Sequence, residues 1–188
     1  MPPSMRYRSR SLSHFIEPCL PRGTAAPPAE PGWLHEIKRD GFRIMARRDS
    51  RGLRLFTRNG YDFAGRFPSI VAAIASLPVR SCLIDGEAIV VDESGLSVFE
   101  LLRYWRHDHV ALLCAFDLIE LNGNDLRRTP IEERKDFLAK LLNRPQEGIA
   151  FNQHYLCDGA VLQARLRARL RGRRVEAPRL ALPLRSGR

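Results

Sequence analysis

Apolar and polar positions alternate over several short segments of the chain, which predicts β-strands from residue 33 onward. Residues 33–38 and 43–47 read as two strands, and the Asp-Gly pair at 40–41 between them predicts a hairpin turn. Residues 53–57 continue as another strand before a turn at 59–60, where the sequence is Asn-Gly. Short turns between successive strands favour antiparallel pairing.

Helical spacing and long apolar runs follow these strands. Residues 67–77 place four apolar side chains on one helical face and end before a proline. Residues 81–92 and 110–121 are apolar runs that predict central strands, with a short helix over 98–104 between them. The sequence Thr-Pro-Ile-Glu that opens residues 129–142 predicts a helix with the threonine as N-cap. This mixture, without a regular strand–helix alternation, predicts an α+β fold with largely antiparallel sheets.

Composition divides the chain into three segments. Residues 1–32 are rich in Pro, Ser and Arg and are expected to be disordered or linker-like. Residues 33–160 hold the predicted elements, and residues 161–188 form an Arg-rich tail. Of the formal net charge of +10, residues 164–188 contribute +8, from nine arginines and one glutamate. The rest is nearly neutral, so the net charge is a property of the tail and is weak evidence for a nucleic-acid surface on the folded part.

Several classes of protein do not match this sequence. The four cysteines lie far apart without a CxxC pair, which argues against a zinc site or a disulfide framework. No segment approaches the roughly 18 to 20 apolar residues of a membrane span, and the first thirty residues lack the apolar run of a secretory signal. We therefore expect a cytoplasmic protein without a membrane partner.

Lys38 has the most informative surroundings in the chain. It precedes Asp40-Gly41 by two positions and Arg43 by five. A lysine amine becomes nucleophilic when burial or nearby cations destabilise its ammonium form, and Arg39, Arg43 or a bound metal can supply that effect. The competing interpretation is a polar hairpin whose basic side chains are solvated.

Three further motifs have both a chemical and a plain structural interpretation. Arg58 precedes the Asn-Gly turn and can reach a phosphate, or it can belong to an ordinary hairpin turn. Asp85 and Glu87 interrupt an apolar strand, where a carboxylate is costly unless a metal or a ribose hydroxyl partners it. The alternative is a β-bulge glycine with edge carboxylates. Phe116 can stack on a base or fill the core.

The order of these motifs, KxDGxR, RNG, DGE and then FDL with a following Asn-Gly, resembles the adenylation domain of ATP-dependent DNA ligases. The likeness covers residues 33–159 and includes the ligase module of bacterial end-joining repair enzymes. It implies an ATP-grasp-like nucleotidyltransferase domain with largely antiparallel sheets flanked by helices. It also implies ATP and Mg²⁺ (or Mn²⁺) as cofactors, and nicked or broken double-stranded DNA as the partner. The sequence does not determine the oligomeric state, and we expect a monomer.

The resemblance also implies a reaction in DNA repair and recombination. In that family a lysine attacks the α-phosphorus of ATP, and pyrophosphate leaves. The lysyl-AMP passes its adenylate to the 5′-phosphate of a nick, where the 3′-hydroxyl displaces AMP. The matched residues would be Lys38 as the catalytic nucleophile, Glu36 as an adenine contact, Arg43 and Arg58 as ribose or phosphate contacts, Glu87 as a ribose or metal ligand, and Phe116 as the adenine-stacking ring.

The sequence departs from the family after residue 159. A motif similar to EGVVSKR is missing, as is the C-terminal OB-fold domain, so we expect truncation to impair nick sealing. Codons for residues 165–184 can be chosen that encode this motif when regrouped from their second base, so the tail is expected to be disordered or frameshift-derived. Two other functions stay open: an RNA ligase or capping-type nucleotidyltransferase, and a catalytically silent nucleotide- or nucleic-acid-binding remnant.

Overall fold

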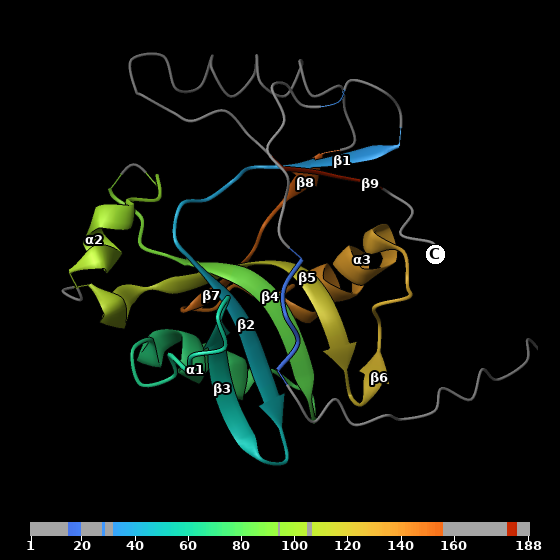
Figure 1. Cartoon of the computed structure of the whole chain (residues 1–188), viewed down its shortest axis with the longest axis horizontal. Coiled ribbons are helices and arrows are strands. Elements are labelled where there is room, and N and C mark those ends of the chain that lie inside the picture. Colours follow the sequence, from blue (N-terminus) through green and yellow to red (C-terminus); the bar gives the residue numbers. More distant parts are fainter. Residues whose placement is uncertain are drawn as a thin grey trace, which may run out of the picture.

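The chain forms two β-sheets accompanied by helices (Figure 1). The computed structural model describes residues 15–19, 28, 32–93, 95–104, 107–155 and 180–183. Over these residues one sheet has six strands and the other has three. The predicted α+β class with largely antiparallel sheets is confirmed.

Six strands make up the larger sheet: β2 (Phe42–Asp49), β3 (Gly52–Thr57), β4 (Cys82–Ile89), β5 (Leu112–Leu121), β6 (Asn124–Asp125) and β7 (Ile149–Phe151). Their order is β3-β2-β4-β5-β6, and β7 pairs with β5. Only the pairing of β5 with β7 is parallel among these described strands. Strands β3, β4 and β5 match the strands predicted at 53–57, 81–92 and 110–121, and these predictions are confirmed.

The smaller sheet has β1 (Trp33–Glu36) at its centre. Strands β8 (His154–Tyr155) and β9 (Leu180–Pro183) pair with it on either side, both antiparallel. Because β1 and β2 belong to different sheets, the hairpin predicted at 40–41 is wrong. Residues 37–41 instead cross from one sheet to the other (Figure 1).

The glycine that suggested this hairpin has another structural cause. A Cβ atom at Gly41 would collide with the carbonyl oxygen of Ala88 in β4. Only a residue without a side chain lets the crossing segment approach β4 so closely. Gly41 therefore fixes where the crossing segment meets the larger sheet.

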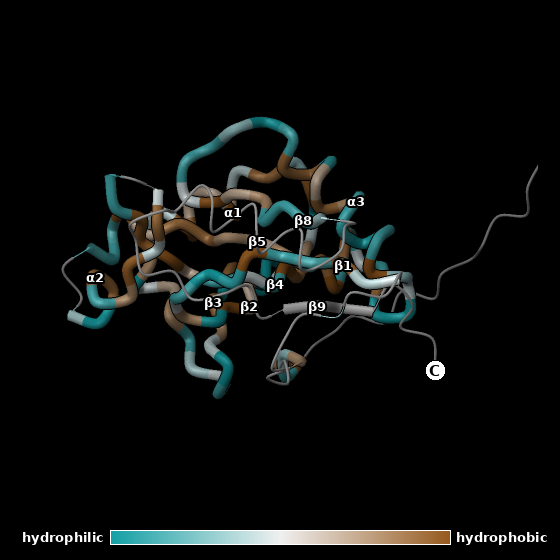
Figure 2. The backbone as a smooth tube through the Cα atoms, turned by 90° about the horizontal axis from the view of Figure 1, so that it is seen from above, coloured by the Kyte–Doolittle hydropathy of each residue, from teal (hydrophilic) through white to brown (hydrophobic). Residues whose placement is uncertain are grey.

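Helices cover the described parts of the sheets: α1 (Pro68–Ser76), α2 (Phe99–Arg103), the 3₁₀ turn η1 (Asp108–Val110) and α3 (Ile131–Leu141). Ile70 and Ile74 of α1 are buried in the main apolar core together with Leu55 of β3. Figure 2 shows apolar positions along α1, β4 and β5 and hydrophilic positions in the outer loops. The three predicted helices are confirmed. Within the described residues, no helix has the length and apolar character needed to span a membrane.

The start of α3 differs by one residue from the predicted capping box. Pro130 occupies the N-cap position, and no side chain caps the helix. The main-chain N–H of Thr129 donates to the carbonyl oxygen of Leu126 (2.9 Å), and its own carbonyl accepts a bond from Arg134 Nη1 (2.6 Å). These bonds hold Thr129 in the preceding turn, so the predicted threonine cap is wrong.

Parts of both terminal segments lie on the folded body. Phe15 packs edge-on against Phe56, with ring centroids 5.7 Å apart, and Pro18 is buried. Residues 15–19 therefore differ from the expectation of a disordered or linker-like segment. Strand β9 likewise places four residues of the Arg-rich tail in a sheet. The frameshift hypothesis concerns residues 165–184, and apart from β9 this stretch lies outside the described residues.

Candidate active site

Lys38 lies in the segment that crosses between the two sheets, and its side chain is exposed. Hydrogen bonds hold the segment on both sides of it. Asn152 Nδ2 donates to the carbonyl oxygen of Ile37 (3.3 Å), and the main-chain N–H of Asp40 donates to Ser97 Oγ (3.2 Å). The backbone at Lys38 is therefore positioned while its amine stays accessible to a substrate.

Arg43 and Asp85 form a two-point ion pair on neighbouring strands. Arg43 Nε donates to Asp85 Oδ1 (2.6 Å), and Arg43 Nη2 donates to Asp85 Oδ2 (2.8 Å) and to the carbonyl oxygen of Cys19 (3.4 Å). Burial works against the charge on Arg43, yet the bonds and charge of Asp85 raise its pKa. The guanidinium also lies 4.3 Å from the ring centroid of Phe116. The buried carboxylate thus has an arginine as its partner.

Phe116 reaches this cluster because β5 has a bulge. Asp85 pairs with Asp117 and Gly86 pairs with Ala115, so Phe116 has no partner in β4. An extra residue of this kind turns a side chain away from regular alternation. A Cβ atom at Gly86 would lie 2.9 Å from the carbonyl oxygen of Cys114 in β5, so glycine is needed where the two backbones approach.

Glu87 lies directly opposite Arg43 in the pairing of β4 with β2, so both side chains emerge on one face. Burial raises the pKa of the Glu87 carboxyl to about 7, while the charges of Arg43 and Lys38 oppose this rise. Asp85 and Asp40 add to the rise through repulsion. The crossing segment therefore brings Lys38 within electrostatic range of a carboxyl that titrates near neutral pH.

Glu36 at the end of β1 pairs with a residue that the sequence analysis missed. Lys135 of α3 is fully buried and forms an ion pair with Glu36 Oε1, and Glu36 itself is only 2% exposed. Lys135 Nζ also donates to the carbonyl oxygen of Phe116 (2.8 Å) and lies 5.3 Å from the ring centroid of Phe151. Burial raises the pKa of the Glu36 carboxyl, and Lys135 opposes that rise.

A sequence signal for Lys135 exists in the spacing of α3. Ile131, Lys135 and Leu138 are separated by four and three positions, which puts them on one helical face, and all three are buried. A lysine on an apolar face needs a partner. The preceding residue, Arg134, forms a two-point pair with Asp117, at 2.8 Å for both bonds. These contacts fix α3 against β5.

Arg58 and Arg39 are two further basic residues that were considered for the site. Arg58 is exposed one residue beyond the Ile44–Thr57 pair, which is the level of Arg43 along the strands. Its described contacts do not join it to the cluster. Arg39 is partly buried beside Cys114 of β5, where burial raises the thiol pKa to about 11 and Arg39 opposes this rise.

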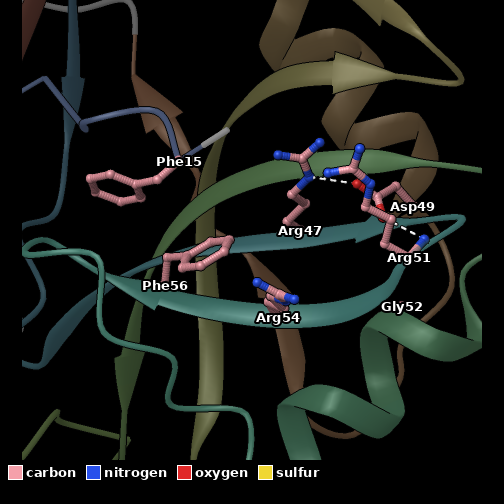
Figure 3. Close-up of a pocket in the computed structure, with 7 residues that line it drawn as sticks. All are labelled: Phe15, Arg47, Asp49, Arg51, Gly52, Arg54 and Phe56. Atoms are coloured by element: carbon pink, nitrogen blue, oxygen red, sulfur yellow. Dashed lines mark hydrogen bonds and ion pairs between the residues drawn. The ribbon is translucent and has the colours of Figure 1, made fainter. Parts of the chain in front are cut away.

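A cavity of about 260 Å³ opens on the β2–β3 hairpin (Figure 3). Arg47 and Arg54 stand directly opposite each other on the two strands, and Arg47 Nε donates to Asp49 Oδ2 (2.7 Å). Arg47 is four positions from Arg43 along β2, so both lie on the same face of the sheet. The cavity is lined by Phe15, Arg47, Asp49, Arg51, Gly52, Arg54 and Phe56.

Metal binding can be judged from the acidic residues. Over the described parts of the chain, no three His, Cys, Asp or Glu side chains gather closely enough to hold a metal ion. Arg43 engages Asp85, which leaves Glu87 as the carboxylate on that face beside Lys38. Mg²⁺ often uses one protein carboxylate together with substrate phosphates. The donors match a metal that arrives with a nucleotide, not one held by these residues alone.

Comparison with known proteins identifies the family. A family model described as the ATP dependent DNA ligase domain matches residues 24–168. The chain belongs to this family. The resemblance drawn from the four motifs is thereby confirmed, and the family is one of ATP-dependent ligases.

Relatives of this ligase domain include the multifunctional non-homologous end joining protein LigD of Pseudomonas aeruginosa. It is 35% identical over 146 residues, which is 75% of this chain and 17% of that protein. The crystal structure of the ligase domain from M. tuberculosis LigD aligns with a TM-score of 0.62 at 29% identity, covering 72% of this chain and 45% of that one. A mycobacterial DNA ligase D complexed with ATP and MES gives the same TM-score and identity.

The ligase domain therefore spans 17% of the Pseudomonas aeruginosa protein and less than half of each of the two solved chains. Its geometry brings together Glu36, Arg43, Glu87 and Phe116, with Lys38 in electrostatic range of Glu87. Arg58 lies outside the contacts that link them. The individual roles assigned to these residues stay predictions.

Proposed function

We propose that this ligase domain transfers AMP from ATP to Lys38 and then to the 5′-phosphate of a DNA nick. The position of Lys38 carries the proposal: an exposed amine, on a fixed backbone segment, beside Glu87 and near the Arg43–Phe116 stack. After losing a proton, Lys38 Nζ forms a bond to the α-phosphorus. The bond from that phosphorus to the bridging oxygen breaks, and pyrophosphate leaves.

The neighbouring side chains would bind the nucleotide. Asp85 occupies Nε and Nη2 of Arg43, so Nη1 is the nitrogen that would contact ribose or phosphate. Arg43 covers one face of Phe116, so adenine would stack on the opposite face. One oxygen of Glu36 faces Lys135, and the other would accept a hydrogen bond from the adenine amino group.

The proposal also includes a metal ion bound with ATP and the location of the protein in the cell. Mg²⁺ or Mn²⁺ carried by ATP would be held by Glu87 and would neutralise charge on the phosphates. A cytoplasmic location and a monomeric state stay predictions.

DNA binding would use the face of the larger sheet that carries Arg43. Arg47, Arg51 and Arg54 line the hairpin cavity together with Asp49, and Arg47 and Arg54 stand directly opposite each other on β2 and β3, where like charges repel. A phosphate would relieve that repulsion, because arginine pairs well with phosphate oxygens. We propose that the hairpin contacts the DNA backbone beside the nick.

Covalent labelling tests the proposed function. Incubation with α-³²P-ATP and Mg²⁺, followed by denaturing electrophoresis, should label the wild-type chain, and Lys38→Ala should reduce the label to background because the nucleophile is gone. Lys140→Ala, which removes an exposed lysine of α3, should leave the label unchanged.

Two outcomes would reject this function. An unlabelled wild-type protein with intact secondary structure would leave the silent nucleotide- or nucleic-acid-binding alternative. A label that passes to a nick in RNA but not in DNA would favour the RNA ligase alternative.

A further inference from the structure

Lys135 joins two parts of the molecule that the proposed nucleotide site needs together. Its ammonium group contacts Glu36, at the end of β1 in the smaller sheet, and the carbonyl oxygen of Phe116, in β5 of the larger sheet. Figure 1 shows α3 beside β5 and close to the smaller sheet, where this contact is made. One buried cation therefore sets the distance between a carboxylate and an aromatic ring on separate sheets.

The burial of Lys135 is not explained by stability alone. The side chain is 0% exposed, and placing an ammonium there costs desolvation energy that its ion pair only partly returns. A buried ion pair can often be replaced by apolar side chains without loss of stability. We therefore explain the burial of Lys135 by its effect on its two acceptors, Glu36 and the Phe116 carbonyl, whose orientation it fixes.

The surroundings restrict Lys135 to one position. Arg134, its neighbour, is tied to Asp117 by two bonds of 2.8 Å, which prevents α3 from shifting along β5. The ring of Phe151 lies 5.3 Å from Nζ and closes another side. With the helix fixed, the lysine holds Glu36 Oε1 in one place, and Oε2 is the oxygen that would accept a hydrogen bond from a ligand.

We propose that Lys135 is a positioning residue that makes the site select a purine with an amino group at position 6. This inference rests on the proposed function, in which Glu36 contacts adenine and Phe116 stacks on it. A carboxylate held as an acceptor bonds a 6-amino group and repels a 6-oxo group. Lys135 acts through Glu36 and touches no substrate atom itself.

The test compares the binding of ATP and inosine triphosphate (ITP), which carries oxygen at position 6, by isothermal titration calorimetry. The wild-type chain should bind ATP more tightly, and Lys135→Met should reduce the ratio of the two affinities by about tenfold or more, as expected for one hydrogen bond to a charged group. Lys135→Arg should keep most of the preference. Lys140→Met, on the exposed side of α3, should leave it unchanged.

A second variant covers the case in which Lys135→Met does not fold. Lys135→Gln keeps a donor for the Phe116 carbonyl but has no charge, so it should fold and still lose the preference for ATP. A purely structural role would lower both affinities together and leave their ratio at the wild-type value, which would overturn the inference.

The outcomes separate this inference from the proposed function. A wild-type chain that prefers ATP but forms no covalent adenylate would reject the reaction and keep the role of Lys135. A chain that is labelled, with folded Lys135 variants at the wild-type ratio, would reject only the role of Lys135. A wild-type chain that binds neither nucleotide would overturn both.

Discussion

Glu87 carries a charge that the folded chain disfavours. Burial raises its pKa from an ordinary value of 4.5 to about 7, although Arg43 and Lys38 attract the carboxylate. The folded protein therefore holds this proton more tightly than the unfolded chain does. By linkage, stability should fall as pH rises from about 4.5 through about 7, and the loss should be complete above that range.

The variant Glu87→Gln should remove this pH dependence. Glutamine resembles the protonated side chain, so the variant and the wild type should have similar free energies of unfolding at pH 4.5. At pH 8 the variant should be more stable by about 1–3 kcal/mol, since the side chain is mostly buried. Urea unfolding at both pH values, with EDTA present, measures the difference.

An exposed acid provides the matched control. Glu93→Gln, in the loop after β4, should change stability little at either pH. If Glu87→Gln gives the same small change at pH 8, the carboxylate is not disfavoured as described here.

Residue types and spacing identified part of this cluster in advance. Arg43, Glu87 and Phe116 followed from motif order, and their proximity is now visible in the pairing of β2 with β4 and in the stack of guanidinium on ring. Lys135 was missed because its importance comes from contacts with β1 and β5, which are far away in sequence. The sequence also did not show which charged residues pair, since nothing in it assigns Asp85 to Arg43.

The segment that crosses between the sheets depends on one glycine. A Cβ atom at Gly41 would overlap the carbonyl oxygen of Ala88, so Gly41→Ala has to push β4 and the crossing segment apart. We expect a loss of about 1–3 kcal/mol in the free energy of unfolding, the usual effect of overpacking. Lys38 should be displaced with the segment, so labelling with ATP should fall more than stability alone explains.

Gly65→Ala is the matched control for this substitution. Nothing lies within 4 Å of a Cβ atom at Gly65, so alanine there should be neutral or slightly stabilising. Urea unfolding and α-³²P-ATP labelling of both variants give the comparison. Equal behaviour of Gly41→Ala and Gly65→Ala would mean that the close approach to β4 is unimportant.

The sequence predicted helices and strands where the local pattern of residues determines them. It did not predict which strands pair with each other. Apolar runs located β4 and β5, helical spacing located α1, and the Thr-Pro-Ile-Glu start located α3. An Asp-Gly pair, however, has the same local appearance in a hairpin turn and in a close approach of two backbones. The bulge at Phe116 was equally hidden, because strand alternation gives no sign of an extra residue.

At the scale of the whole molecule, two groups of side chains share one face of the larger sheet. They are the nucleotide cluster (Arg43, Glu87 and Phe116) and the hairpin arginines (Arg47, Arg51 and Arg54). Arg43 and Arg47 are four residues apart on β2, a separation of about 13 Å along an extended strand. Duplex DNA carries its phosphates densely enough that a nick at Lys38 would place others near Arg51 and Arg54. The proposed DNA contact therefore follows from how the strands align the two regions.

Removing these exposed arginines should weaken DNA binding without affecting adenylation. The double variant Arg51→Ala/Arg54→Ala should lower affinity for a nicked duplex about tenfold. It should also reduce by about 2 the slope of log affinity against log salt, one unit for each lost phosphate contact. Labelling by ATP should be unchanged, because both residues lie outside the nucleotide cluster. Fluorescence anisotropy at several salt concentrations measures affinity and slope.

The control has to remove the same charge elsewhere, because the chain has a formal net charge of +10 and will attract DNA non-specifically. Arg103→Ala/Arg144→Ala also removes two exposed arginines, from the end of α2 and the segment after α3. A contact specific to the hairpin makes its variant the weaker binder of the two at every salt concentration. Equal losses in both variants would assign the effect to net charge and would remove the hairpin from the DNA surface, while the nucleotide cluster would keep its proposed role.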